Sequence, residues 1–217
     1  KGKGGASIRS SVPIRLEAGQ AAFTTFNGLE NGKEHFALCF GDWKTQAHPL
    51  VRVHSECLTG DVFGSHRCDC GGQLREALGF LAREGGILIY LRQEGRGIGL
   101  YNKIDAYALQ AKGADTFEAN NRLGFAWDLR TYEAAAAMLK ALSKTSVRLV
   151  TNNPEKIRGL EEGGIEIKEI CRTGVYLQPE NRAYLEAKVA KANHALALTE
   201  IPQFLRHPDE SRGPGSE

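Results

Sequence analysis

Short apolar runs alternate with helix-like segments through the middle of this 217-residue chain, and this pattern constrains its fold most. Short apolar runs are typical of strands, whereas apolar residues recurring every three or four positions indicate amphipathic helices. Strands are expected at Phe36–Phe40, Leu50–Val53, Gly86–Leu91 and Val147–Val150, and helices near 72–84, 98–112, 131–143 and 154–163. The alternation predicts an α/β fold, a mixed sheet with flanking helices, in which the strand-rich first third pairs antiparallel to the rest.

One compact domain with loose ends is expected from length and composition. A chain of 217 residues is long enough to bury one substantial core. Residues 1–12 are rich in Gly, Ser and Lys and are expected to be disordered. Residues 13–195 are expected to form the domain, and residues 196–217 a helix end and a loose tail.

The charge balance argues against a general attraction to nucleic acid or to membranes. Lys and Arg total 28 against 26 Asp and Glu, a net charge of +2. No apolar run approaches the roughly 20 residues that a membrane-spanning helix needs. Five cysteines are too few for a disulfide scaffold, so a reducing, cytoplasmic setting is expected.

Cys57, Cys68 and Cys70 form an odd-numbered group that suits a metal better than disulfides. Zinc held by three protein ligands keeps a fourth position for water, as in catalytic sites. A buried apolar role is the simpler interpretation of free cysteines. Polar neighbours argue against it: Glu56, Thr59, Asp61, His66, Arg67 and Asp69. The ligand set stays open, because His54 or His66 competes, and Cys39 or Cys171 would close the shell into a structural site.

A glycine-rich segment, Leu91–Leu100, lies between an expected strand and an expected helix. Glycines let the backbone approach a phosphate, free N–H groups are available at a helix start, and Arg92 and Arg96 add forked donors. Its spacing is Gly-x-Gly-x-Gly, which disfavours a dinucleotide-binding turn of the Gly-x-Gly-x-x-Gly type. The segment therefore predicts a phosphate-binding loop.

Two further segments carry polar groups next to expected helices. Asp128 and Arg130 share a face only if their segment is extended or in a turn, and spacing alone favours the alternative, a helix N-cap followed by a solvated arginine. In Thr151–Pro154 a strand runs into a helix, and the hydrogen-bonding groups there lie where α/β sheets hold ligands, with Lys156 adding a cation. An ordinary Asn-Pro turn is the equal alternative.

Taken together, these motifs resemble GTP cyclohydrolase II, the enzyme family that opens riboflavin biosynthesis. The resemblance covers roughly residues 15–195, with the motifs in the family's order and at closely similar spacing. It runs through Arg52–Asp61, Arg67–Gly71, Arg92–Arg96, Asn102–Gln110, Asp128–Arg130 and Thr151–Pro154. The resemblance implies that residues 13–195 are the catalytic domain.

The reaction that the resemblance implies is hydrolysis of GTP to 2,5-diamino-6-(5-phosphoribosylamino)pyrimidin-4(3H)-one, formate and pyrophosphate. Cys57, Cys68 and Cys70 would hold one Zn²⁺ per chain, whose water opens the imidazole ring at carbon 8. Mg²⁺ is expected on the triphosphate, and a homodimer is expected from the family. Three thiolates donate strongly and lower the Lewis acidity of zinc, so neighbouring groups must help to activate the water.

The resemblance also assigns residues. Tyr107 would assist ring opening, and Arg130 would attack the α-phosphorus with Asp128 as proton acceptor. Because a neutral guanidine is scarce, charge stabilisation by Arg130 during attack by water is the alternative. Contacts to GTP are expected from Arg52, Val53, His54, Ser55, Glu56, Gln73, Glu94, Gly95, Arg96, Thr116, Thr151 and Lys156. Within this set the phosphates would be held by Glu94, Gly95, Arg96, Thr151 and Lys156.

Two other functions remain open at this stage. A related enzyme on the same scaffold would stop after ring opening and release a formylamino product, although the presence of Tyr107 argues against it. A zinc-stabilised nucleotide or RNA-binding module would use the cysteines structurally. The near-neutral charge and the absence of a basic, aromatic stripe disfavour RNA.

Overall fold

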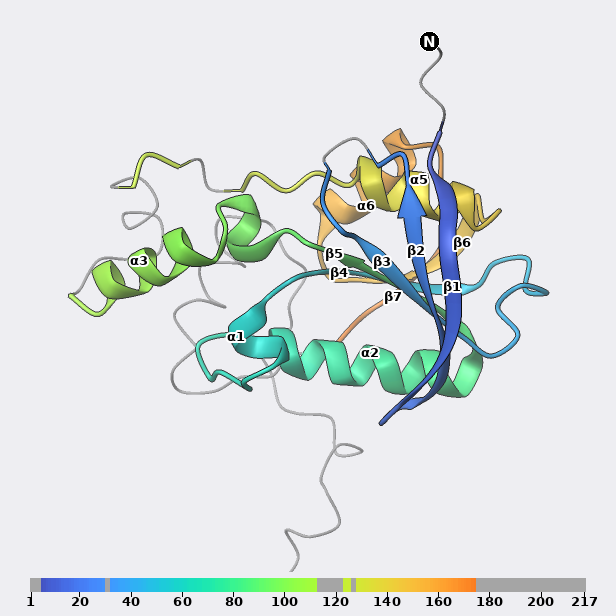
Figure 1. Cartoon of the computed structure of the whole chain (residues 1–217), viewed down its shortest axis with the longest axis horizontal. Coiled ribbons are helices and arrows are strands. Elements are labelled where there is room, and N and C mark those ends of the chain that lie inside the picture. Colours follow the sequence, from blue (N-terminus) through green and yellow to red (C-terminus); the bar gives the residue numbers. More distant parts are fainter. Residues whose placement is uncertain (1–4, 30–31, 113–122, 126–127, 175–217) are drawn as a thin grey trace, which may run out of the picture.

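A computed structural model describes residues 5–29, 32–112, 123–125 and 128–174, and its seven described strands form one sheet (Figure 1). The strand order is β1-β2-β3-β5-β4-β6-β7. The strands are β1 Ser7–Leu16, β2 Gly19–Asn27, β3 Phe36–Phe40, β4 Leu50–Ser55, β5 Gly86–Leu91, β6 Ser146–Val150 and β7 Glu166–Cys171. The helices are α1 Leu58–Asp61, α2 Cys70–Glu84, the 3₁₀ turn η1 Glu94–Gly97, α3 Leu100–Gln110, α5 Glu133–Ala141 and α6 Pro154–Glu162.

The sheet is antiparallel in its first half and parallel in its second. Strands β1, β2, β3 and β5 pair antiparallel in that order, whereas β4 pairs parallel with both β5 and β6, and β6 with β7. The carboxyl ends of β4, β5 and β6 therefore meet at one edge, the place where α/β sheets hold ligands. The predicted mixed α/β fold is confirmed.

Helices cover both faces of the sheet. Helix α2 lies on one face, and α5 and α6 lie on the other (Figure 1). Side chains of β5 alternate accordingly: Leu88 packs in the same cluster as Leu81 of α2, whereas Ile87 and Ile89 join Met138 of α5 on the other face. A strand covered on both faces reads as a continuous apolar run, which explains why β5 is evident from the sequence.

The expected strands and helices match β3, β4, β5, β6, α2, α3, α5 and α6. The expectation of disorder over residues 1–12 is wrong for residues 7–12, which belong to β1. This edge strand leaves Ile8, Val12 and Ile14 exposed, and its order comes from pairing with β2, which composition does not reveal. Residues 196–217 lie outside the described residues. None of the described helices is long and apolar enough to cross a bilayer.

Candidate active site

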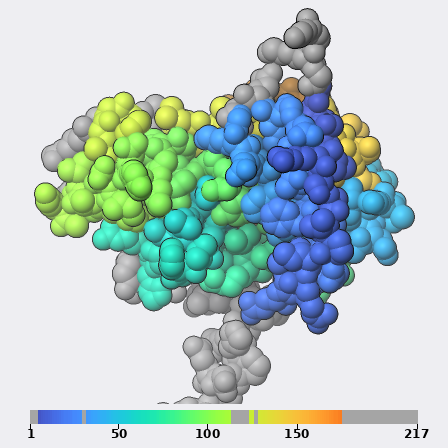
Figure 2. Space-filling model, in the orientation of Figure 1, coloured from blue at the N-terminus to red at the C-terminus, as the bar shows by residue number. Residues whose placement is uncertain are grey.

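Three functional segments follow the parallel strands at one edge of the sheet. Residues 56–61 follow β4, residues 92–99 follow β5, and residues 151–156 follow β6. Helix α3 extends away from the sheet beyond this edge (Figure 1) and forms a lobe on the side opposite β1 (Figure 2). The predicted cysteine, phosphate-loop and Asn-Pro segments thus come together.

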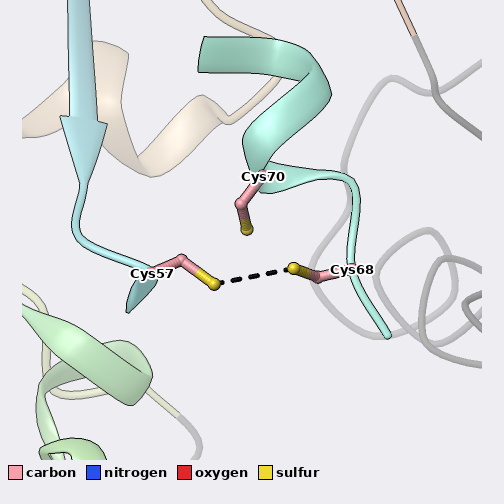
Figure 3. Close-up of side chains that lie close together, drawn as sticks. All are labelled: Cys57, Cys68 and Cys70. Atoms are coloured by element: carbon pink, nitrogen blue, oxygen red, sulfur yellow. Dashed lines mark hydrogen bonds between the residues drawn. The ribbon is translucent and has the colours of Figure 1, made fainter. Parts of the chain in front are cut away.

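The three cysteine sulfurs point toward one another (Figure 3). Cys57 caps α1 and Cys70 is the first residue of α2, and the Sγ atoms of Cys57, Cys68 and Cys70 lie within 4.8 Å of one another. The Sγ atoms of Cys57 and Cys68 are 3.5 Å apart. Tetrahedral zinc with bonds of about 2.3 Å places its sulfurs about 3.8 Å apart, so this donor set fits zinc.

Two glycines leave room for this cluster, and sequence reasoning missed them. A Cβ on Gly60 would lie 2.7 Å from Sγ of Cys68 and 3.2 Å from Sγ of Cys57. A Cβ on Gly71 would lie 2.2 Å from the carbonyl oxygen of Gly60, so only glycine lets α2 approach α1 this closely. The available signal was glycine inside a helix, which is unfavourable unless packing requires it.

Asp61 anchors the segment that carries Cys57. Its carboxylate accepts hydrogen bonds from the Cys57 backbone N–H at 3.0 Å and from the Tyr90 hydroxyl at 2.8 Å. Nε2 of His54 lies 3.0 Å from both carboxylate oxygens. Burial lowers the pKa of His54 despite the opposing effect of Asp61. His54 is therefore engaged by Asp61 rather than by the cluster.

The other competing ligands also lie outside the cluster. Cys39, in β3, packs in the core, where burial raises the pKa of its thiol to about 11. Cys171 ends β7, and neither it nor His66 belongs to the group. Among the residues that the structure describes, the three cysteines form the one group of three or more candidate ligands.

Lys103, which sequence reasoning assigned no role, lies beside the cluster. Its Nζ donates to Sγ of Cys57 at 3.1 Å, to Oγ1 of Thr59 at 3.0 Å and to Oε1 of Glu94 at 2.8 Å. Hydrogen bonds from the Cys68 and Cys70 thiols, aided by the charge of Lys103, lower the pKa of Cys57. An ionised Cys57 suits a metal ligand.

Tyr107 lies one turn after Lys103 on α3, at the same end of the site. Nζ of Lys103 is 5.8 Å from the centre of the Tyr107 ring, and the Arg67 guanidinium is 4.8 Å from it. Arg67 precedes Cys68 in the chain. The fold thus brings the predicted tyrosine toward the segment that carries the cysteines.

The predicted phosphate loop turns sharply and contacts the segment 128–130. Gly95 and Arg96 both have left-handed backbone conformations, with φ of 61° and 60°. The backbone N–H of Leu129 donates to the Arg96 carbonyl at 3.0 Å. A Cβ on Gly97, where φ is +95°, would lie 3.0 Å from Cβ of Leu129. Glycine therefore permits this close approach.

Asp128 and Arg130 form a forked ion pair. The Arg130 backbone N–H and Nε donate to Oδ1 of Asp128 at 3.0 and 2.9 Å, and Nη2 of Arg130 donates to Oδ2. Burial opposes ionisation of Asp128, but the hydrogen bonds and charge of Arg130 outweigh it and lower the pKa of Asp128. The N-cap of α5 is Tyr132, so the interpretation of Asp128 as a helix cap is wrong.

Several expected GTP residues are held by one another at the end of β4. Arg52 donates to the Val150 carbonyl at 3.1 Å and to Oε1 of Gln73 at 2.8 Å. Val53 is a core residue, and its carbonyl accepts from Nζ of Lys156 at 2.8 Å. In the described part of the chain, three buried atoms there lack a hydrogen-bond partner: Nε of Arg52, Nδ1 of His54 and Oγ of Ser55.

The remaining described residues expected to contact GTP form an ion pair or lie in the turn that starts α6. Glu56 accepts from Nε of Arg92 at 2.9 Å. Thr151 Oγ1 accepts from the Asn153 backbone N–H, and Asn153 caps α6 by accepting from the backbone N–H of Glu155. The segment therefore runs from β6 into the helix α6, as the expected strand-to-helix transition predicted. Thr116 lies outside the described residues.

Comparison with known proteins identifies the family. The family model for GTP cyclohydrolase II matches residues 7–172. A GTP cyclohydrolase-2 from Vibrio cholerae is 54% identical over 197 residues, which are 89% of this chain and 100% of the relative. The chain belongs to the GTP cyclohydrolase II family. It is therefore an enzyme of this type.

Two further relatives and one solved structure are also similar to this chain. A GTP cyclohydrolase-2 from Psychromonas ingrahamii is 50% identical over 193 residues, 87% of this chain and 96% of the relative. A riboflavin biosynthesis protein RibBA from Bacillus cereus is 57% identical over 173 residues, 79% of this chain and 43% of the relative. A solved two-domain 3,4-dihydroxy-2-butanone 4-phosphate synthase from A. baumannii covers 80% of this chain and 41% of its own, at 17% identity and a TM-score of 0.44.

Proposed function

We propose that this chain hydrolyses GTP to 2,5-diamino-6-(5-phosphoribosylamino)pyrimidin-4(3H)-one, formate and pyrophosphate, in riboflavin biosynthesis. The observation that carries the proposal is the meeting of two chemically different groups at one sheet edge. A thiol cluster that fits zinc adjoins Lys103, and the loop 94–97 links Lys103 to the Asp128–Arg130 pair. The names of the relatives in the same family support it.

Cys57, Cys68 and Cys70 would hold one Zn²⁺, which supplies Lewis-acid activation of water for opening of the guanine imidazole ring. Tyr107 is our candidate for moving a proton during ring opening, because its ring lies beside Lys103 and the segment around Cys68. The burial of Cys57 keeps solvent from one side of the cluster.

Arg130 would stabilise the charge that develops at the α-phosphorus while water attacks. An arginine guanidinium stays protonated near neutral pH, the forked pair holds it against Asp128, and a carboxylate whose pKa is lowered is a poorer proton acceptor. Both features favour charge stabilisation over covalent attack by Arg130. A guanylylated enzyme attached at Arg130, trapped in a single turnover, would contradict this assignment.

The triphosphate would lie between the loop 94–97 and the segment 151–156, with Mg²⁺ neutralising part of its charge. The left-handed turn at Gly95 and Arg96 gives the loop a sharp bend of the kind whose backbone N–H groups can bind phosphate oxygens, although the Gly95 N–H itself donates to Glu94. The unpartnered Nε of Arg52, Nδ1 of His54 and Oγ of Ser55 suit contacts to GTP, because buried polar groups normally find partners. Thr116, outside the described residues, stays a proposed contact.

Three broader assignments complete the proposal. We propose that residues 13–195, together with the β1 residues 7–12, form the catalytic unit. A homodimer is proposed as the assembly. A cytoplasmic setting remains an expectation from cysteine usage.

The test follows both products in one reaction. Purified protein with Zn²⁺, Mg²⁺ and GTP should release formate and pyrophosphate, and mass spectrometry should identify the diaminopyrimidinone product. Pyrophosphate without formate, together with a formylamino product, would support the alternative ring-opening enzyme. Neither product, with zinc measured in the protein, would favour the binding-module alternative and overturn the proposal.

A further inference from the structure

Lys103 is a buried lysine whose three donor positions are all used within the protein. The residue is 8% exposed, and its ammonium group donates to Cys57, Thr59 and Glu94 at 2.8–3.1 Å. A protonated lysine has three N–H donors and no acceptor. Its contacts therefore satisfy the group without a substrate, which argues for a positioning role rather than for direct binding.

Glu94, which accepts a hydrogen bond from Lys103, also accepts hydrogen bonds from two other segments. One of its carboxylate oxygens accepts from Lys103 and from the Gly95 backbone N–H at 2.7 Å, and the other accepts from the Leu58 backbone N–H at 2.6 Å. Leu58 directly follows the ligand Cys57, and Gly95 belongs to the phosphate loop. The Lys103–Glu94 pair thus joins the cysteine segment, the loop and α3.

The charge of the cluster explains why a cation belongs here. Three thiolates around Zn²⁺ leave a net charge of about −1 and donate strongly, which lowers the Lewis acidity of the metal. A hydrogen bond from an ammonium group to one sulfur withdraws charge from it, and partners of this kind tune a metal site. Cys57 receives such a bond from Lys103 at 3.1 Å.

We propose that Lys103 is a positioning residue for the metal centre, which fixes Cys57 against Glu94 and withdraws charge from the Cys57 sulfur. This role rests on the zinc-dependent function already proposed, because it assumes that the cysteine cluster binds the metal. The cysteine cluster and the loop 94–97 then behave as one unit. A purely structural salt bridge with Glu94 would instead leave the metal–sulfur bonds unchanged.

The test uses Co²⁺ as a spectroscopic replacement for zinc. In Lys103→Met, we expect affinity for Co²⁺ and Zn²⁺ to fall about 10–100-fold, and the sulfur-to-cobalt charge-transfer band to shift. Lys103→Arg should restore part of the affinity because it keeps a cationic donor. Lys112→Met removes an exposed lysine just beyond α3 and should leave both measurements unchanged.

A double variant guards against misfolding. Lys103→Met leaves Glu94 as a buried, unpaired charge, whereas Glu94→Gln combined with Lys103→Met removes both charges. The double variant should keep the shifted band, since Cys57 still lacks its donor. Wild-type affinity and band in both variants would overturn the role of Lys103 while leaving the proposed function intact. A wild-type protein that binds neither metal would overturn both.

Discussion

The cysteine cluster and the Asp128–Arg130 pair are held in place by different means. The cluster is fixed by contacts from several segments, including Asp61, Lys103 and the close approach at Gly60. The described contacts of the Asp128–Arg130 segment include the forked hydrogen bonds between the two residues and its approach to the loop through Leu129, and its side chains are 27% and 16% exposed. The comparison teaches that the structural effects of a substitution should extend through the neighbouring segments in the first region but stay local in the second.

The largest expected effect is loss of a cluster cysteine. Cys68→Ser should remove bound zinc and reduce formate release to background, because two thiolates no longer complete the donor set. Pyrophosphate release should partly persist, since the hydrogen bonds described for Asp128 and Arg130 join them to each other rather than to the cysteines. Metal analysis with both product assays measures this, and Cys171→Ser is the matched control. Equal loss of both products would show that the metal also holds the substrate.

Arg130→Lys tests the second region. Lysine keeps a charge but loses the forked geometry, so we expect pyrophosphate release to slow by about 10²–10³-fold. Zinc content should stay at the wild-type level. Arg158→Lys, on the exposed side of α6, is the control. A fall in zinc content would refute the independence of the two regions.

Gly60→Ala tests the space inside the cluster. The added Cβ would crowd the Cys68 and Cys57 sulfurs, so zinc affinity should fall about 10–100-fold. Competition with a coloured chelator measures the affinity. Gly79→Ala, in α2, has its nearest atom at 3.6 Å and should instead stabilise the fold by about 0.5–1 kcal/mol. Unchanged affinity in Gly60→Ala would mean that the two segments separate easily.

Gly97→Ala should have the smallest effect, a fall in pyrophosphate release of about tenfold, because the Cβ displaces Leu129 and its neighbours. Gly99→Ala provides the contrast. It shares a positive φ, of +89°, yet its Cβ would meet nothing within 4 Å. Steady-state rates of pyrophosphate release in both variants distinguish the contribution of the contact with Leu129 from that of backbone strain. Equal rates would assign the effect to strain alone.

Features with local causes were predictable from the sequence. The β5 run is apolar because both faces are covered, and the cysteines stand close together in the chain. The edge strand β1 was missed because the Gly, Ser and Lys content of residues 1–12 indicates disorder, although Ile8, Val12 and Ile14 alternate with other residues as in a strand. Asp128 was misjudged as a helix cap because its carboxylate accepts hydrogen bonds from Arg130, two residues away, instead of from the N-terminus of a helix.

Residues whose roles depend on distant partners could not be found from the sequence. Lys103 contacts a cysteine 46 positions earlier, and no local pattern marks that meeting. Gly60 matters because of atoms from Cys68 and the start of α2, which only folding brings near. Sequence patterns therefore located the cluster but not the groups that surround it.

The separation of partners along the chain also sets the order in which the site is completed during translation. The three cysteines all lie within residues 57–70, which are made before Lys103 and the later segments. Arg52 donates a hydrogen bond to the Val150 carbonyl, 98 positions later in the chain, and Lys156 donates one to the Val53 carbonyl, 103 positions earlier. The thiols that suit a metal therefore leave the ribosome together, well before the partners that close the rest of the site exist.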